Sequence, residues 1–564
     1  MLLGPAGAGK SMLARRLTTI LRAIPLPEAL ATTYLLRVAG RTGVRGAFIT
    51  THPCRAPHYT ISDMGLVGGG QVPLPGEVSA CLLGQPSCDR RARALPRKRR
   101  CLLRFGIDNH DNAGATAGDG RNIQYRDQSG RAMGRFTTTL VLIALTIALV
   151  CAPVASADLR SYVKADDQAY RWEYVTQTDR TDGTTVHELR VISQVWQGIT
   201  WQHRLQIVIP QAPQDMPSLT FLIISGSTPA EQELREAVFM ARQLNAPVAI
   251  LYDIPNQPLF GGLVEDDLLA HTFVQFIATQ DTTWPLLLPM VKGVVRAMDT
   301  IQAFMPRQLN AQVSGFLLSG ASKRGWTAWL TPVVDDRVRG IAPLVYDNLD
   351  LARQMQHQRE TWGHFSGQIA KYTERGLPQR LLSGEKAAVE LAAIVDPFRY
   401  RQHLTVPKLI VLGTNDRYWP LDALNLYYDA LIGERYILYI PNAGHELRSG
   451  RERTLAGLMA FFQHMAGRLQ LPTLRWEATV KERTLTLSIT SDRVPRAVRA
   501  WVATASTKDF REARWEAFEV QAEPHGYVYR HDKGPQGVTA IFGEAEFEAG
   551  VGAFVLTTTV HLFP

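Results

Sequence analysis

The sequence of 564 residues predicts an α/β protein with a doubly wound, mostly parallel sheet, followed by a C-terminal β-sandwich. Continuous runs of Val, Ile and Leu, typical of strands buried on both faces, alternate with helix-like stretches in the middle of the chain. From Leu474 to the end, six short segments instead alternate apolar and polar residues between turn-like breaks. This second pattern is typical of a sandwich of immunoglobulin or fibronectin type.

Length and charge divide the chain before any motif is considered. A chain of this length exceeds one hydrophobic core. Residues 1–157 hold 20 of the 61 basic and 8 of the 52 acidic residues, so their formal net charge is +12, and the rest of the chain has −3. All five cysteines also precede residue 158. The main body is therefore expected neither to bind nucleic acid nor to hold a disulfide framework or thiolate metal site.

The front segment begins with a phosphate-binding motif. The residues Gly4, Gly7, Gly9, Lys10 and Ser11 fit G-x-x-x-x-G-K-[ST], in which glycine N–H groups surround phosphates, the lysine contacts phosphate oxygens and the hydroxyl helps to hold Mg²⁺. Together with the run RAPHYTISDMGLVGGGQVPLPGEVSA, residues 1–83 resemble magnesium-chelatase-like AAA+ ATPases. The resemblance implies ATP and magnesium as cofactors of a working fragment.

This P-loop fragment departs from its family in two places. Only three residues precede the motif, so the strand that should present it is nearly missing, and no apolar strand ending in acidic residues follows Leu83. We therefore expect a truncated fragment without ATPase activity, and no cofactor for the protein as a whole. Residues 84–132 are predicted to be a basic, disordered linker.

Residues 133–157 have the pattern of a signal peptide. Arg135 supplies the positive charge, Leu140 to Val150 supply the apolar segment, and Ala155-Ser-Ala157 matches the small-x-small cleavage rule. The pattern predicts a start at Met133 and a periplasmic or secreted product. If residues 133–157 are retained, the same segment would anchor the protein in the inner membrane.

The body, residues 158–470, contains a strand–turn–helix around a serine. An apolar run from Val313 leads into Gly320-Ala-Ser322, and a helix-compatible stretch follows. The arrangement resembles the nucleophile elbow of α/β-hydrolases, in which the turn exposes the serine Oγ at the carboxyl end of a strand. Ser322 is thus the candidate nucleophile.

Two further residues follow predicted strands at the same edge of the sheet. Asp416 follows the run that begins at Lys408, and His445 follows the run that begins at Tyr436. The chain order Ser322, Asp416, His445 is that of the α/β-hydrolases. It predicts a triad in which His445 accepts the serine proton and Asp416 orients the imidazole. Asp347, at the end of an earlier strand, is the alternative acid.

The oxyanion of such a hydrolase needs two N–H donors. The residue after the nucleophile, Lys323, is expected to supply one from its backbone. Gly226 or Ser227, in the loop after the run that begins at Leu219, is expected to supply the other.

The runs GASKRGWTAWL, MVKGVVRAMDTIQ, VDPFRYRQHLTVPKLIVLGTNDRYW and ILYIPNAGHE make residues 158–564 resemble the PhoPQ-activated pathogenicity-related family. The resemblance implies an α/β-hydrolase fold and an exported bacterial envelope protein. Gly325 stands one place later than the last glycine of G-x-S-x-G, as in glucuronoyl esterases. By that analogy Lys323 or Arg324 would favour a substrate with a carboxylate, unless the cation pairs with Asp335 or Asp336.

Other side chains are candidates for the substrate cleft. Residues 348–386 interrupt the sheet as a polar, helical insertion, which is expected to form a lid with Trp362 and His364 as its contacts. Aromatic side chains expected to line the cleft, or else to pack in the core, are Tyr252, Phe260, Trp284, Trp362, Tyr418 and Trp419.

The leading hypothesis is an exported serine hydrolase that acts on a small or envelope-derived ester or amide. The alternatives are a non-catalytic envelope binding protein of the same fold and, less favoured, an AAA+ ATPase. No nucleic-acid partner and no metal are expected, and membrane contact is expected only if residues 133–157 are retained. The C-terminal domain, residues 471–564, is expected to serve for packing or presentation in preference to binding.

Overall fold

The computed structural model describes residues 159–564, apart from 167, 211–215, 227–230, 310, 535 and 551, together with residues 68, 69, 74 and 75. The chain divides into two units, Met1–Ile147 and Ala148–Pro564. In the first unit, β1 (Gly68–Gly69) pairs antiparallel with β2 (Leu74–Pro75). The predicted linker and signal peptide lie outside the described residues.

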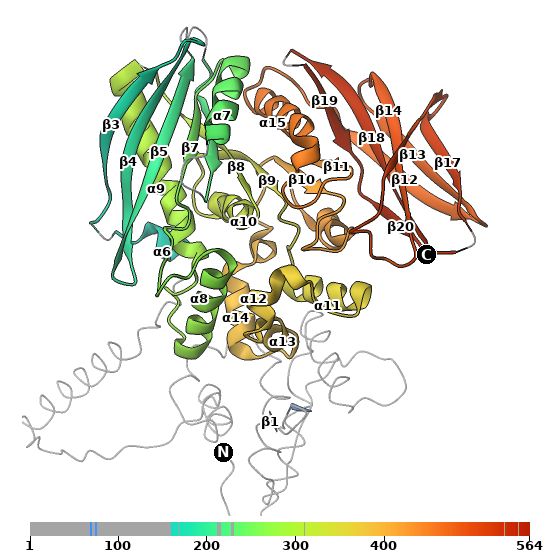
Figure 1. Ribbon diagram of the computed structural model, residues 1–564, viewed down its shortest axis with the longest axis horizontal. Helices are drawn as coiled ribbons and strands as arrows, with labels where there is room; N and C mark the ends of the chain where they lie inside the picture. The colour runs from blue at the N-terminus through green and yellow to red at the C-terminus, as the bar shows by residue number, and fades with distance from the viewer. Residues whose placement is uncertain are drawn as a thin grey trace, which may run out of the picture. The chain divides into compact units, whose positions relative to one another are not determined.

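The second unit is built on a nine-stranded sheet (Figure 1). Six adjacent strands are parallel, and three antiparallel strands continue the sheet beyond β7. In spatial order the strands are β11 (Arg435–Ile440), β10 (Lys408–Gly413), β9 (Val338–Leu344), β8 (Gly315–Ala321), β6 (Leu219–Ile224), β7 (Val248–Leu251), β5 (Ile199–Pro210), β4 (Thr184–Trp196) and β3 (Arg171–Asp179). This order, with a crossover between β6, β7 and β8, is that of the α/β-hydrolase fold.

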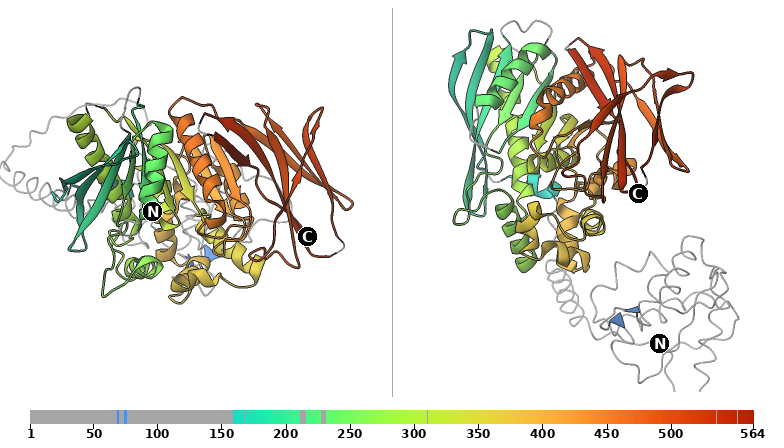
Figure 2. Two further views of the ribbon diagram at one scale, coloured as in Figure 1. Left: turned by 45° about the horizontal axis from the view of Figure 1, so that its top comes forward. Right: turned by 45° about the vertical axis from the view of Figure 1, so that its right-hand side comes forward.

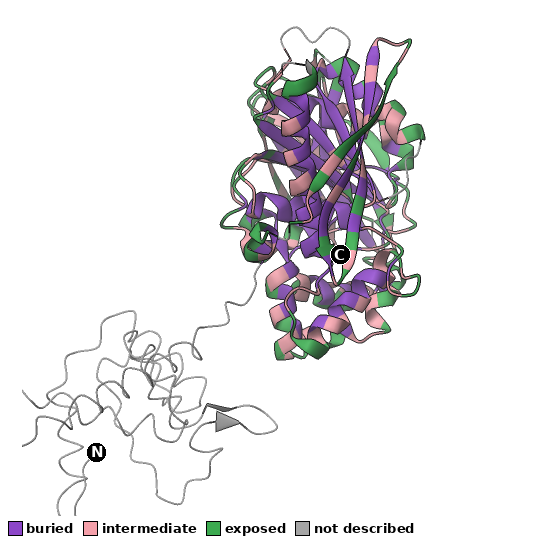
Figure 3. Ribbon diagram, turned by 90° about the vertical axis from the view of Figure 1, so that its left-hand side faces the viewer, coloured by how far each residue is buried: buried purple, intermediate pink, exposed green. Residues whose placement is uncertain are grey.

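Helices cover both faces of the parallel strands, which explains their continuous apolar composition. One hydrophobic core packs α8 (Glu265–Thr279), α9 (Leu287–Leu309) and α10 (Lys323–Leu330) against one face. A second core packs α7 (Glu231–Leu244) and α15 (Arg451–Met465) against the other. Figure 3 shows the strands as the most buried part of the unit.

A helical insertion follows β9 and gathers with α8 beyond the carboxyl ends of the parallel strands (Figures 1 and 2). Its helices are α11 (Leu351–Trp362), α12 (Ala370–Thr373), α13 (Leu377–Leu382) and α14 (Lys386–Val395), with 3₁₀ turns η5 (Gly367–Ile369) and η6 (Pro397–Tyr400). The buried carboxylate of Asp396 accepts backbone hydrogen bonds from Asp350, Leu351 and Phe398, and so joins the two ends of the insertion.

The C-terminal residues form two antiparallel sheets that face each other as a sandwich. One contains β12 (Leu474–Lys481), β13 (Thr484–Ser491), β17 (Gly526–Asp532) and β16 (Ala522–Glu523); the other contains β15 (Glu516–Glu519), β14 (Ala497–Ala505), β18 (Val538–Ala549), β19 (Gly552–Thr557) and β20 (His561–Phe563). The sandwich packs on β11, where Tyr439 N–H donates to Thr557 Oγ1 at 3.0 Å.

The structure confirms the predicted fold class and differs from the sequence prediction in detail. The prediction missed the antiparallel strands β3 and β4. β3 is almost entirely exposed, and β4, although mostly buried, mixes polar with apolar residues, so neither has a continuous apolar run. The segment between β10 and β11 contains two 3₁₀ turns, η7 (Ala423–Leu426) and η8 (Tyr428–Ala430). There the Tyr427 N–H donates to the Leu424 carbonyl, which closes a 3₁₀ turn, and the Ala423 carbonyl accepts from the Gln354 side chain. Among the described residues, no helix is long and apolar enough to cross a membrane.

Candidate active site

Ser322 occupies the tight turn between β8 and α10. Its backbone has φ 56° and ψ −123°, a left-handed conformation that costs a non-glycine residue roughly 1–3 kcal/mol. The turn brings strand and helix very close: a Cβ on Gly320 would lie 2.8 Å from the backbone carbon of Arg324, and one on Gly325 would lie 3.0 Å from the Gly320 carbonyl oxygen. Gly325 therefore permits close packing of the helix on the strand, although it stands one place later than the last glycine of G-x-S-x-G.

His445 and Asp416 meet at the carboxyl ends of β11 and β10. The histidine Nδ1 lies 2.7 Å from Asp416 Oδ2, and Asp416 Oδ1 accepts the backbone N–H of Tyr418 at 2.8 Å. Both carboxylate oxygens are thus engaged, and the Asp416 side chain is only 8% exposed. With Nδ1 against a carboxylate, the imidazole is held in the orientation that leaves Nε2 for other chemistry.

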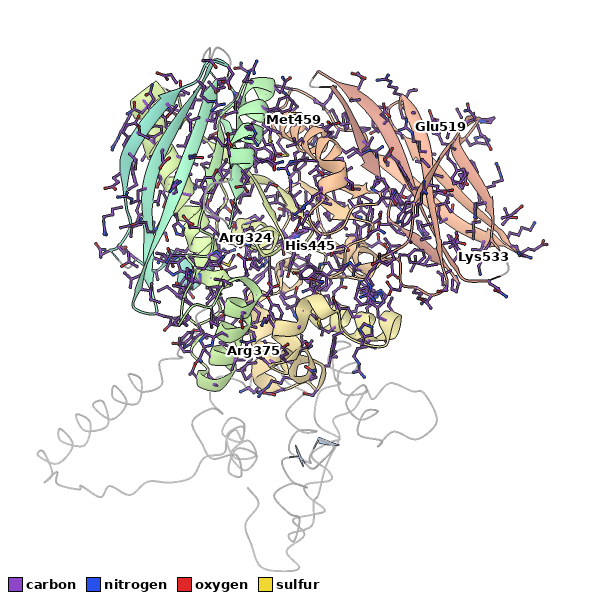
Figure 4. The ribbon with its side chains drawn as sticks, viewed as in Figure 1. Arg324, Arg375, His445, Met459, Glu519 and Lys533 are labelled. Carbon is purple, nitrogen blue, oxygen red and sulfur yellow. The ribbon has the colours of Figure 1, made fainter. Side chains whose placement is uncertain are left out.

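The second nitrogen of His445 is available. Nε2 is buried and has no hydrogen-bond partner among the described residues, Ser322 included. The ring of Tyr418 stacks on the imidazole with centroids 4.1 Å apart, and Tyr418 also lines the same cavity as Ser322. In Figure 4, His445 and Arg324 both lie in the central part of the α/β domain, between the sheet and the insertion helices.

Asp347, the alternative acid, lies at the end of β9 and is buried. Burial, together with the neighbouring Asp416 charge, raises the pKa of its carboxyl well above the ordinary value, which favours the neutral form. Its Oδ1 has no hydrogen-bond partner among the described residues. The acid that His445 bonds is Asp416 and not Asp347.

The two cations after Ser322 are engaged by acids that sequence reasoning missed. Lys323 Nζ lies 2.7 Å from Glu265 Oε2 and 3.1 Å from Asp266 Oδ1. Arg324 makes two hydrogen bonds of 2.7 Å to the two oxygens of Glu265. Burial alone would raise the pKa of Glu265, but the hydrogen bonds and charge of Arg324, with Lys323, hold it well below its usual range. The three successive acids Glu265, Asp266 and Asp267 were the available signal.

The expected pairing of these cations with Asp335 or Asp336 is therefore wrong. Asp335 instead pairs with Arg337 at 2.6 Å, at the opposite end of the sheet from the serine turn. Because Glu265 and Asp266 neutralise Lys323 and Arg324, the charge proposed to attract a substrate carboxylate is already satisfied.

The expected oxyanion donors lie on either side of the serine. Lys323 begins α10 directly after Ser322. Gly226 follows β6, the strand next to β8, and lies against Arg324: a Cβ on Gly226 would come within 1.8 Å of the guanidinium. Arg324 Nε also donates to the Ile254 carbonyl at 2.6 Å, so the loops after β6 and β7 are held against the serine turn. Ser227 lies outside the described residues.

A cavity of about 110 Å³ opens beside Ser322, under the insertion helices. Apolar side chains of α8, α10 and the insertion make most of its wall. The lining residues with polar groups are Ser322, Lys323, Asp266 and Asn348, with Tyr346, Tyr372 and Tyr418. Of the aromatic candidates, Tyr418 and Trp419 line it. Tyr252 is instead a core residue whose hydroxyl donates to Gln206, and Phe260 and Trp284 pack together, with ring centroids 5.5 Å apart.

The insertion covers the site, but through other residues than expected. Trp362 lies under the guanidinium of Arg511, 4.3 Å from its ring centroid, and the exposed His364 bonds the Phe365 carbonyl. Neither lines the cavity. Leu351, Met355 and Leu391 do so.

One loop of the sandwich supports the loops that carry Asp416 and His445. Asn415 Nδ2 donates to the Ala513 carbonyl at 2.7 Å. Asn442, in the loop after β11, exchanges two hydrogen bonds with the backbone of Trp515, at 2.8 and 3.0 Å. The C-terminal domain thus contributes to the geometry of the site, which no local sequence pattern indicated.

The P-loop residues Gly4, Gly7, Gly9, Lys10 and Ser11 lie outside the described residues. In the described part of the chain, no group of three or more His, Cys, Asp or Glu side chains is arranged to hold a metal ion.

The strand order and the serine turn define an α/β-hydrolase-fold protein. Residues 159–511 match the PhoPQ-activated pathogenicity-related protein family, and the chain belongs to that family. Residues 1–87 match magnesium chelatase subunit ChlI, which agrees with the resemblance of the P-loop fragment.

Two relatives illustrate the two parts. The autocrine proliferation repressor protein A of Dictyostelium discoideum is 29% identical over 446 residues, which cover 72% of this chain and 89% of that protein. The uncharacterized protein YifB of Salmonella typhimurium is 40% identical over 79 residues, 14% of this chain and 15% of that protein. Among solved structures, acetyl xylan esterase 1 from Thermoanaerobacterium sp. aligns at 14% identity with a TM-score of 0.38, over 55% of this chain and 94% of that chain.

Proposed function

We propose that the protein is a serine hydrolase of esters or amides, with Ser322 as nucleophile, His445 as general base and Asp416 as the acid that orients it. The arrangement of His445 carries the proposal. Its Nδ1 is held by Asp416 at 2.7 Å, while Nε2 is buried and unbonded among the described residues. A part-buried imidazole whose buried Nε2 is unbonded, at the same strand ends as a strained serine turn, is suited to accept a proton.

The chemistry follows from these positions. Ser322 Oγ attacks the carbonyl carbon while its proton passes to His445 Nε2, and the negative charge of Asp416 stabilises the imidazolium. The backbone N–H of Lys323, with an N–H from Gly226 or Ser227, stabilises the oxyanion. His445 then protonates the leaving alcohol or amine, and a water molecule, activated by the same imidazole, releases the acid and restores Ser322.

The serine and the histidine are not hydrogen-bonded to each other in this structure. Catalytic hydrogen bonds of free hydrolases are often open and close when substrate binds. Asp416 is preferred to Asp347 because the acid of a triad has to be ionised, and burial favours the neutral form of Asp347.

A fluorophosphonate probe, which labels only an activated serine, tests the proposal. We expect the wild-type protein to be labelled and Ser322→Ala and His445→Ala to remain unlabelled. Ser314→Ala, which removes an exposed serine at the start of the same strand, is the matched control and should label normally. Labelling of Ser322→Ala at the wild-type rate, or none of the wild type, would favour the non-catalytic binding protein.

We further propose export to the periplasm or the medium, on the evidence of the signal-peptide pattern at residues 133–157. The substrate would then be a small or envelope-derived ester or amide. N-terminal sequencing of protein recovered from the periplasm and medium should give Asp158 as first residue. Recovery of a chain that retains Met1 would overturn this proposal and leave the hydrolase proposal standing.

A further inference from the structure

The cavity beside Ser322 is largely apolar. Its wall is built by α8, α10 and all four insertion helices, with Phe273, Trp326, Leu377, Leu391, Ala392 and Val395 among its side chains. Burial of hydrocarbon against a wall of this kind is favourable. The Tyr346 hydroxyl and Asn348 Oδ1 of two lining residues have no hydrogen-bond partner among the described residues, but both groups are neutral and cannot balance a charge.

The two charged side chains that line the cavity, Lys323 and Asp266, neutralise each other. Lys323 Nζ lies 3.1 Å from Asp266 Oδ1, and the hydroxyls of Tyr372 and Tyr418 also donate to Asp266, at 3.3 and 3.4 Å. An ionised group on the substrate would therefore lose its hydration in the cavity without gaining an unpaired charge of opposite sign.

The position of His445 shows which part of an ester the cavity would hold. The leaving oxygen has to reach His445 Nε2 to be protonated. His445 is not among the residues that line the cavity, whereas Tyr418, whose ring stacks on the imidazole, does line it. The alcohol or amine thus belongs on the histidine side, and the acyl group on the cavity side.

We propose that this cavity binds the acyl group of the substrate, and that this group is a neutral hydrocarbon chain or ring of about six carbons. The proposal rests on the serine hydrolase function proposed above. The size follows from the volume: a cavity of about 150 Å³ holds benzene, and this one measures about 110 Å³ with an open mouth. Acetyl would leave most of it empty, and a decanoyl chain would exceed it.

Hydrolysis of p-nitrophenyl acetate, hexanoate and decanoate tests the chain length. Each buried methylene is worth about fourfold, so kcat/KM should be at least about tenfold higher for hexanoate than for acetate and should fall again for decanoate. The p-nitrophenyl monoester of adipic acid, which carries a carboxylate at the end of a six-carbon chain, tests neutrality. Its kcat/KM should be at least about tenfold below that of hexanoate.

Two neighbouring alanines of α14 provide matched variants. Ala392 lines the cavity, whereas Ala393 is exposed. Ala392→Leu should lower the hexanoate-to-acetate ratio of kcat/KM about tenfold, and Ala393→Leu should leave it unchanged. Leu391→Ala enlarges the cavity without overpacking it, and should move the preference towards decanoate.

A binding measurement separates this proposal from the hydrolase proposal. Trp326 and Trp419 line the cavity, so hexanamide should change the tryptophan fluorescence of Ser322→Ala with saturation, and acetamide should not. If the protein is active but its kcat/KM for p-nitrophenyl acetate equals that for the hexanoate, the acyl-chain proposal alone is overturned. If the fluorophosphonate probe does not label the wild type but hexanamide binds with saturation, the hydrolase proposal is overturned and the acyl pocket is supported. If neither labelling nor binding is observed, both proposals are overturned.

Discussion

The guanidinium of Arg324 donates two hydrogen bonds, both of 2.7 Å, to the two carboxylate oxygens of Glu265. The two residues are 59 positions apart and join the first turn of α8 to the first turn of α10, directly after Ser322. A parallel pair of bonds fixes the planes of both groups, so this ion pair positions the serine turn as well as balancing its charge.

Glu265→Gln should destabilise the protein by about 2 kcal/mol, since it leaves the buried Arg324 without its carboxylate and leaves Lys323 with Asp266 alone. This loss of stability is smaller than the roughly 3–5 kcal/mol for breaking a fully buried pair, because the Glu265 side chain is 41% exposed. Glu231→Gln removes an exposed acid paired with Arg235 and should cost no more than about 0.5 kcal/mol. Denaturant unfolding measures both; equal effects would contradict the structural role of Glu265.

Asp416→Asn should lower kcat for ester hydrolysis by about 10³–10⁴-fold, because an amide can hold His445 in the wrong tautomer. Asp347→Asn should lower it by less than about threefold, since an amide replaces a carboxyl that burial already favours as neutral. Steady-state kinetics on p-nitrophenyl hexanoate compare the two. The reverse order would make Asp347 the acid.

Asn442→Ala should lower kcat about tenfold, because the loop that carries His445 loses two hydrogen bonds to Trp515. Asn425→Ala is the matched control. Asn425 also bonds the sandwich, to the Val560 carbonyl at 2.8 Å, but from η7 and not from a loop with a proposed catalytic residue. Similar stability losses with unequal kcat losses would show that the sandwich positions the site. Equal kcat losses would contradict it.

Asp396 should make stability depend on pH. Burial raises the pKa of Asp396 to about 6, whereas an aspartate in an unfolded chain titrates near pH 4, roughly. The native state therefore retains a proton that the unfolded state releases, and the free energy of unfolding falls as pH rises from about 4 to about 6, by up to about 3 kcal/mol. Asp396→Asn should remove this slope.

Thermal melts at half-unit steps from pH 4 to pH 7.5 measure how the stability of the wild type changes with pH relative to that of Asp396→Asn. The stability of the wild type relative to the variant should decline up to about pH 6 and then stay level. A constant difference over the whole range would show that Asp396 titrates alike in the folded and unfolded chains.

Local patterns in the sequence predicted the parallel half of the sheet and the turn at Ser322. Continuous apolar runs identify strands buried on both faces, and such strands place their following residues at one edge. That rule selected Asp416 and His445 together, and the structure places them 2.7 Å apart. The antiparallel strands β3 and β4 were missed, because the exposed β3 and the mixed polar and apolar β4 contain no continuous apolar run.

The sequence by itself thus determined which residues stand at strand ends, since that depends on neighbours in the chain. The tertiary structure decided what surrounds them. The basic turn Lys323-Arg324 suggests an acidic substrate, but in the fold Glu265 and Asp266 lie against it and balance its charge. The lid was expected to act through Trp362, whereas Leu391 and Ala392 line the cavity. Charge balance and cavity shape depend on residues far apart in sequence, which only folding brings into contact.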